Sequence, residues 1–279
     1  MLCACRFAAR DPSTRRAIEL QLPSDPPLPL QELCYHQLVA PPHLVQAVLQ
    51  RCPPSLAALS LAESSFCDIP AAVRSISCLQ RLDLSYNRFE DLRPLACLTT
   101  LTSLSLERVG LRDVPPELSR LTALRSLSLR HNPEIRGSWA PLAALQGSLT
   151  RLDTSGTGLA GTAHLPDELT TLSGLRWLDA SSNGVRSWRQ LAALQRLTHL
   201  ALRSCQLSEL PAEALAATGL RSLNLSRNER LSEDGLGRLS ALRSLTCLDL
   251  SACFVSRLPP SLSALTSLQQ LLLAAFELL

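Results

Sequence analysis

The sequence predicts an α/β solenoid in which short parallel strands form a curved sheet, with short helices, 3-10 turns and extended segments on its outer face. Two observations lead to this prediction. The pattern Leu-x-x-Leu-x-Leu recurs from residue 56 to the end of the chain, at spacings of 22 to 26 residues. Hydrophobic residues make up 46% of the chain but aromatic residues only 4%, which favours many thin leucine layers over one thick core.

Each repeat begins with a leucine that opens a short strand. Leu-x-Leu alternation places the leucines on one face of the strand, and a single repeat cannot bury that face without a neighbour. Adjacent repeats are therefore expected to pair as parallel strands. Residues 56–279 hold nine full repeats and a partial tenth, with no C-terminal cap. The repeats begin at Leu56, Leu79, Leu101, Leu124, Leu149, Leu175, Leu197, Leu220, Leu245 and Leu268.

The ninth position of the repeat alternates between asparagine and other residues. A buried amide at this turn can bond unpaired backbone groups of its own repeat and of the neighbouring one. Repeats without asparagine carry an aliphatic–proline pair, such as Ile69–Pro70, which favours an extended or 3-10 return segment. The asparagine repeats can hold a short helix instead, as over 232–242. The four structural asparagines are Asn87, Asn132, Asn183 and Asn228.

This alternating pattern, in its fullest form Leu-x-x-Leu-x-Leu-x-x-Asn-x-Leu, resembles the leucine-rich-repeat family. The resemblance extends over residues 56–279 and is to the intracellular type, with alternating Asn-type and Leu-Pro-type repeats. It implies a right-handed horseshoe with a concave parallel sheet. Because the family serves many processes, the resemblance alone implies no particular activity.

The two ends depart from the repeat pattern. Residues 1–29 are rich in proline and arginine, and we expect an N-terminal extension that is partly disordered, with 17–22 as a candidate edge strand. Residues 30–55 are interpreted as a degenerate repeat, a strand followed by a helix over 43–52, that caps the core. Residues 268–279 start a repeat that no polar capping unit follows, which predicts a truncated gene model or self-association through this edge.

Charge and cysteine usage narrow the possible functions. All 27 basic residues are arginine, and a net charge of +3 with both signs interspersed argues against a nucleic-acid surface. The 10 cysteines are scattered, which favours reduced thiols and a cytoplasmic location. The arginine-rich N-terminus leaves an organelle transit peptide open. No apolar stretch approaches the roughly 20 residues that span a bilayer.

The sequence contains no recognisable catalytic or cofactor motif. Its five histidines lie in different repeats or in the cap, and none has a cysteine or aspartate at metal-ligand spacing. The glycines of 155–161 fit a loosened turn in the repeat register better than a phosphate loop. We therefore expect a non-enzymatic protein without a metal or cofactor.

Positions three, five, seven and eight of each repeat are expected to face the concave side of the sheet. Trp177, at position three, marks this face as a binding surface, because an exposed tryptophan loses burial that a partner can restore. Arginine and tyrosine, which also dominate interface energies, recur nearby. The candidate partner-binding residues are Arg81, Tyr86, Arg108, Arg130, His131, Arg151, Asp153, Trp177, Asp179, His199, Arg203 and Arg227.

A longer period shows which of these positions vary. Residues 79–160 align without gaps on 175–256, a shift of 96 residues that we interpret as a four-repeat duplication. Trp177 and Ser182 stand where the first copy has Arg81 and Tyr86, whereas the leucine framework is retained. The outward-facing residues have therefore changed between the copies while the residues that build the strand have not.

The sequence favours a protein-interaction scaffold that binds a protein or peptide on its concave face. A substrate-recognition subunit of a ubiquitin ligase is one alternative, because a chain without lysine avoids modification of itself. A fragment of a receptor or immune-type sensor is another. Ciliary and small-GTPase regulatory roles are implied only by the family resemblance.

Overall fold

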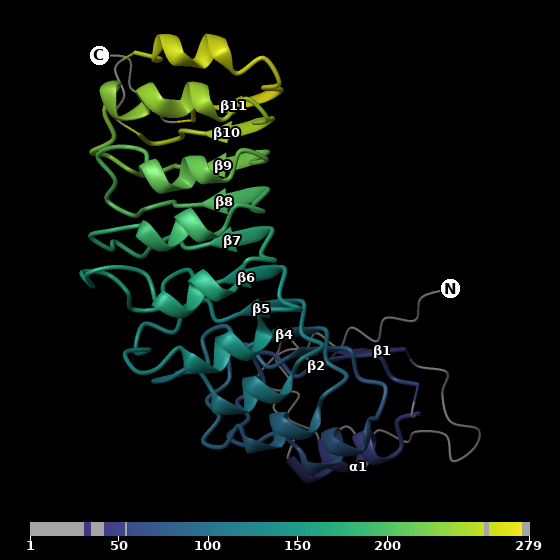
Figure 1. Ribbon diagram of the computed structural model, residues 1–279. Helices are drawn as coiled ribbons and strands as arrows, with labels where there is room; N and C mark the ends of the chain where they lie inside the picture. The colour runs from purple at the N-terminus through teal and green to yellow at the C-terminus, as the bar shows by residue number, and fades with distance from the viewer. Residues whose placement is uncertain (1–30, 35–41, 54, 254–256, 275–279) are drawn as a thin grey trace, which may run out of the picture.

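The computed structural model describes residues 31–34, 42–53, 55–253 and 257–274. The described residues form one sheet of eleven parallel strands in chain order, stacked along one side of a bent column, with the return segments stacked beside them (Figure 1). The strands are β1 (Glu32–Cys34), β2 (Ala58–Ser60), β3 (Arg81–Asp83), β4 (Ser103–Ser105), β5 (Ser126–Ser128), β6 (Arg151–Asp153), β7 (Trp177–Asp179), β8 (His199–Ala201), β9 (Ser222–Asn224), β10 (Cys247–Asp249) and β11 (Gln270–Leu272).

The leucines of the repeat fill the space between the sheet and the return segments. The first leucine and those at positions four and six are buried in most repeats, as Leu79, Leu82 and Leu84 are in the β3 repeat. Each strand pairs in register with the next, so that equivalent leucines lie side by side. The core is thus a continuous stack of leucine layers, and the solenoid expected from the sequence is confirmed.

The return segments are 3-10 helices in both types of repeat. We predicted a short helix over 232–242 in an asparagine repeat, and that segment instead forms the 3-10 helix η8. With about 23 residues to complete a turn, a tightly wound segment spans the return side better than a wider α-helix. The return helices are η1 (Ala71–Ser75), η2 (Arg93–Cys97), η3 (Pro116–Arg120), η4 (Ala140–Leu145), η5 (Asp167–Thr171), η6 (Arg189–Ala193), η7 (Ala212–Ala216), η8 (Asp234–Ala241) and η9 (Pro260–Ala264).

Before the first regular repeat lie strand β1 and the helix α1 (Pro42–Gln50). β1 pairs with β2, and α1 buries Val45 and Leu49 against the core. At the other end β11 pairs with β10 alone among the described residues, and Leu272 is 48% exposed on the strand face. The expectations for residues 1–29, including the edge strand over 17–22, lie outside the described residues.

The structural asparagines link successive repeats through their amides. Asn132 is completely buried and its Oδ1 accepts hydrogen bonds from the backbone N–H groups of Val109, Gly110 and Leu111. Its Nδ2 donates to carbonyl oxygens of its own repeat and to that of Leu106 in the preceding one. Asn87 and Asn228 are bonded similarly, and Asn183 also links its repeat to the preceding one, through fewer hydrogen bonds.

Position eight adopts a left-handed backbone in every full repeat. There Tyr86 has φ 56° and Arg227 has φ 57°, and glycine occurs at this position only as Gly156. The turn allows the position-eight N–H to donate to the position-seven carbonyl of the next repeat, as Tyr86 does to Glu107 at 2.8 Å. This bond continues the sheet ladder past the strand end, which offsets the strain of a non-glycine residue with positive φ.

Candidate binding surface on the strand face

The in-register sheet arranges the outward residues into columns. Arg151, Trp177 and His199 occupy position three of their repeats, which is the first residue of β6, β7 and β8. They are direct neighbours across the sheet. One column over, Asp153 and Asp179 occupy position five. Adjacent strands lie about 4.8 Å apart, so side chains in one column can contact each other directly.

Trp177 is packed beneath its neighbour Arg151. The guanidinium carbon of Arg151 lies 3.4 Å from the centroid of the Trp177 ring, a close cation–π stack. Trp177 is consequently half-buried, and our prediction that its ring faces water was only partly right. The ring is covered by a charged side chain that remains exposed and that a partner can reach. The two other tryptophans, Trp139 and Trp188, are buried beside the return helices.

The position-five aspartates also have a role within the fold. Oδ1 of Asp153 accepts hydrogen bonds from the backbone N–H and the hydroxyl of Ser155, at 2.9 and 2.6 Å. Asp179 accepts from the N–H of Ser181 in the same way. Burial raises the pKa of the Asp153 carboxyl, and the Ser155 hydrogen bonds oppose that shift. Each carboxylate thus uses its Oδ1 to hold the strand end.

Towards the N-terminal end, the candidate residues form a polar network around Tyr86. The Tyr86 hydroxyl donates to a carboxylate oxygen of Glu107 at 2.9 Å, and Arg130 lies 3.6 Å from the same carboxylate. The hydrogen bond to Glu107 raises the pKa of the Tyr86 phenol, so the hydroxyl stays a donor. Arg108 lies 6.0 Å from the centre of the Tyr86 ring. Arg81, further along, is paired with Glu32 of β1.

The remaining candidates stand apart from these contacts. Arg203 and Arg227 are exposed and form no ion pair within the described part of the chain. His199 is exposed, with Nδ1 2.9 Å from the Thr198 hydroxyl. His131 is half-buried beside the turn at Gly156. Arg203 occupies position seven of its repeat, whereas four other repeats have a small, buried residue there: Ser85, Ser155, Ser181 and Ser226.

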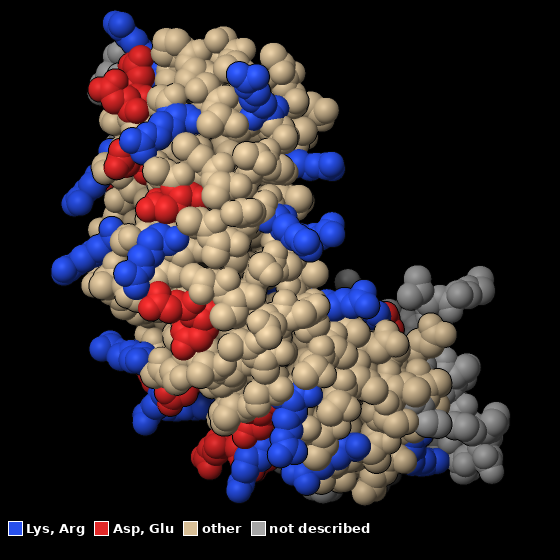
Figure 2. Space-filling view, viewed as in Figure 1, with Lys and Arg blue, Asp and Glu red and all other residues tan. Residues whose placement is uncertain are grey.

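Sequence reasoning missed two residues at this surface. Glu32 lies in the degenerate first repeat, where the register was uncertain, yet it neutralises Arg81. Arg88 directly follows the asparagine slot, a position that we did not count as outward-facing. Figure 2 shows basic side chains projecting along the strand edge, while the opposite flank carries acidic and basic side chains together. Reading one residue past the asparagine in each repeat would have found Arg88.

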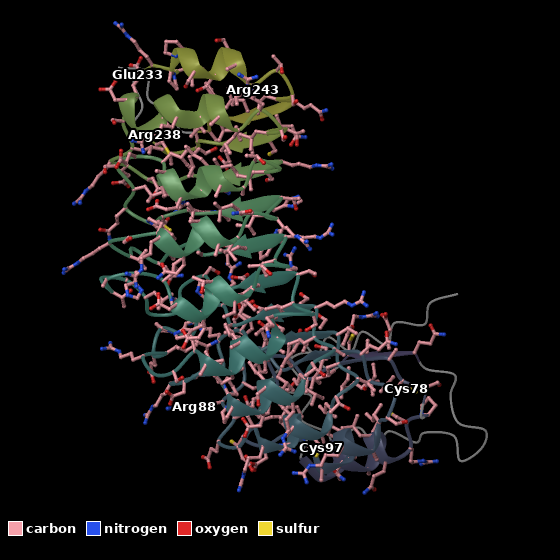
Figure 3. The ribbon with its side chains drawn as sticks, in the orientation of Figure 1. Cys78, Arg88, Cys97, Glu233, Arg238 and Arg243 are labelled. Carbon is pink, nitrogen blue, oxygen red and sulfur yellow. The ribbon has the colours of Figure 1, made fainter. Side chains whose placement is uncertain are left out.

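Metal-ligand clusters, disulfides and membrane-spanning helices are absent from the described residues. Across them, no three histidine, cysteine or acidic side chains come together as metal ligands would. The cysteines described, including the exposed Cys78 and Cys97 in the N-terminal half (Figure 3), form no disulfides with one another. Within the same residues, no helix has the length and apolar character needed to cross a membrane.

One repeat of the chain matches a known family model. The model is described as Leucine Rich Repeat, and it matches residues 78–98, which contain β3 and the start of its return. The same unit recurs along the sheet from β2 to β11. The fold is a leucine-rich-repeat solenoid. No curated protein shows a significant sequence match to it.

The solved structures that are similar to this chain are distant from it in sequence. An internalin from Listeria monocytogenes is 18% identical, with 87% of this chain and 86% of that chain covered and a TM-score of 0.47. Internalin C2 from the same organism is 22% identical, covering 82% and 83%, with a TM-score of 0.49. A plant peptide hormone receptor, RGFR1 in complex with RGF2, is 22% identical over 79% of this chain and 40% of that one, with a TM-score of 0.48.

Proposed function

We propose that this protein is a non-catalytic interaction scaffold that binds a protein or peptide on the concave face of its sheet. The observation that carries the proposal is the Arg151–Trp177 stack at the centre of the strand face. Tryptophan and arginine are the residue types most enriched among the residues that dominate binding energy. Here they are already held together before any partner arrives, which lowers the entropy lost on binding.

The surroundings of the stack support recognition of a polypeptide. The small serines at position seven leave room for a partner's side chains. His199, Arg203 and Arg227 extend the surface towards the C-terminal repeats. A partner lying across the columns would thus meet aromatic and cationic groups in succession.

We place this role in the cytoplasm, as for the intracellular type of leucine-rich-repeat protein. Support comes from the thiols: Cys34, Cys67, Cys78 and Cys97 are exposed and unpaired among the described residues. Exposed single thiols persist in reducing compartments and are oxidised or paired outside them.

The test is affinity purification from the native cells with the wild-type chain, the double variant Arg151→Ala/Trp177→Ala and a control, Arg238→Ala. Arg238 is exposed on the return helix η8, away from the strand face (Figure 3). We expect the double variant to lose its partner, with affinity at least about thirtyfold weaker, while the control retains it. Thermal melts establish that all three chains fold. A partner recovered equally by the double variant would refute binding at this surface.

A further inference from the structure

A second recognition site lies where the strand face meets the turns of the β2, β3 and β4 repeats. An open depression of about 400 Å³ is found there, which we call the Tyr86 depression. Tyr86 lies four repeats before Trp177, so the depression is separate from the central stack. Its lining residues are Ser65, Cys67, Tyr86, Asn87, Arg88 and Arg108.

The walls of the Tyr86 depression are held by the backbone. Tyr86 and Arg108 are position-eight residues, each fixed by a hydrogen bond to the next repeat, at 2.8 and 3.0 Å. The Arg88 N–H donates to the Phe66 carbonyl at 3.2 Å, which joins the turn of β3 to that of β2. The amide of Asn87 is fully engaged with backbone groups of both repeats. The shape of the site is thus set before a ligand binds.

The charge of the lining is one-sided. Arg88 and Arg108 are both exposed, and neither forms an ion pair with a described residue. Among the described residues, no carboxylate lines the depression. The nearby carboxylate of Glu107 is already occupied by the Tyr86 hydroxyl and by Arg130. Two arginines therefore line one hollow, and no described acidic residue lines it with them.

We propose that the Tyr86 depression binds an anionic side chain, a carboxylate or a phosphate, of a bound polypeptide. Two guanidinium groups are the donors that proteins use most for such anions, because their paired N–H groups match two oxygens at once. The Tyr86 ring, 42% exposed, offers an apolar wall for the rest of the side chain. That the anion belongs to a polypeptide rests on the proposed function, whereas the preference for an anion does not.

Cys67 provides a probe inside the site. Its thiol is exposed, as is the thiol of Cys97 in η2, which serves as the matched control. The folded chain is alkylated in parallel with iodoacetate, which is anionic, and iodoacetamide, which is neutral, and each cysteine is quantified by peptide mass spectrometry. Both reagents react with the same thiolate, so the ratio of their rates cancels differences in thiolate content and measures the local preference for an anion.

We expect the iodoacetate-to-iodoacetamide ratio at Cys67 to exceed that at Cys97 by about threefold to tenfold at low salt, and to fall as salt is raised. Arg88→Gln/Arg108→Gln should remove the excess at Cys67 and leave Cys97 unchanged. Equal ratios at the two cysteines of the wild-type chain would overturn the proposal, and this comparison does not depend on the variant folding.

A protection experiment then identifies the source of the anion. Cys67 is alkylated with iodoacetamide in the presence of hexaglutamate or of a phosphoserine peptide of equal length. Slower reaction with hexaglutamate assigns a carboxylate, and slower reaction with the phosphopeptide alone assigns a phosphate. If neither peptide protects Cys67, the site does not bind polypeptide anions. The chain with Trp177→Ala should keep the Cys67 ratio, so failure of the central surface and failure of this site are distinguishable.

Discussion

At the scale of single residues, the asparagine slot shows how many backbone hydrogen bonds one side chain can make. Asn132 contributes six hydrogen bonds to backbone groups of two repeats. Asn183 occupies the same slot but makes three, with Thr157, Thr154 and Ala180. Both amides are completely buried, so the two sites differ in bonding and not in exposure.

This difference predicts unequal costs for the same substitution. Asn132→Ala should destabilise the chain by about 3–5 kcal/mol, because it strands several buried N–H and C=O groups, and Asn183→Ala should cost clearly less. Urea unfolding followed by circular dichroism measures both. Equal losses, or a larger loss for Asn183→Ala, would mean that the hydrogen bonds do not set the contribution of the slot.

In two repeats without asparagine, a cysteine thiol occupies the slot. Cys205 Sγ lies 3.4 Å from the carbonyl oxygen of Ala180, the same oxygen that Asn183 bonds. Cys253 contacts the carbonyl of Leu225 likewise. Burial raises the pKa of the Cys205 thiol to about 12, so the group stays protonated and acts as a donor. The thiol thus supplies one of the hydrogen bonds to carbonyl oxygens that the asparagine amide supplies in other repeats.

The shifted thiol makes stability depend on pH on the alkaline side. An unfolded Cys205 releases its proton near pH 9, whereas the folded one retains it to about pH 12. Ionisation therefore favours the unfolded state between these values, and stability should fall by up to about 1.4 kcal/mol per pH unit above pH 9. Urea titrations at pH 8, 9 and 10 measure the slope. Cys205→Ala should reduce it, whereas Cys97→Ala, at an exposed thiol, should not; identical slopes for both variants would contradict the assignment.

The residues of the candidate surface could be predicted only in part. The repeat register places Arg151 and Trp177 in one column, since position three is fixed by the leucines on either side. Their stacking could not be read from the sequence, because it depends on the rotamers of two long side chains on adjacent strands. The pairing of Arg81 with Glu32 was missed because Glu32 lies in the degenerate first repeat, where the register was uncertain.

At the scale of elements, the strands and the 3-10 returns of the proline repeats were predictable, whereas the returns of the asparagine repeats were not. Every described strand from β2 to β11 begins two residues after the first leucine of its repeat, because Leu-x-Leu spacing has one solution in a stacked sheet. The return side must instead match the width of its neighbours, so a helix-prone segment such as 232–242 becomes the 3-10 helix η8. Local propensity yields there to packing between repeats.

The turn after β6 gives a test at this scale. Gly158 has φ 74°, and a Cβ there would collide with the backbone carbonyl of Pro133 in the preceding repeat. Gly158→Ala should therefore cost about 2–4 kcal/mol of stability. Gly147 lies between η4 and β6, and a Cβ added there would meet open space. Gly147→Ala should therefore be neutral or slightly stabilising. The melting temperatures of the two variants test this expectation, and that of Gly158→Ala should be the lower. Similar values would show that the turn can relax around the added methyl group.

At the scale of the whole molecule, the backbone elements of each repeat pack against those of the adjacent repeats. The ends have one neighbour and the middle has two, so stability should fall from the centre outwards. Hydrogen exchange should show the strongest protection for the amides of β5 to β8, and the weakest for β1 and β11. Uniform protection along the sheet would indicate one cooperative unit.

Measurements at several protein concentrations also test whether copies associate through the β11 edge, which would protect that strand as concentration rises.

The left-handed turn at position eight has a consequence for how such a chain can change. Its backbone makes the inter-repeat bond, so the fold leaves the side chain free: tyrosine, arginine, histidine, serine and glycine all occur there. The cost of exchanging one for another is small unless the newcomer is β-branched. Each full repeat therefore carries one outward residue that can be substituted with little effect on the fold. Binding specificity can drift, or be engineered, one repeat at a time.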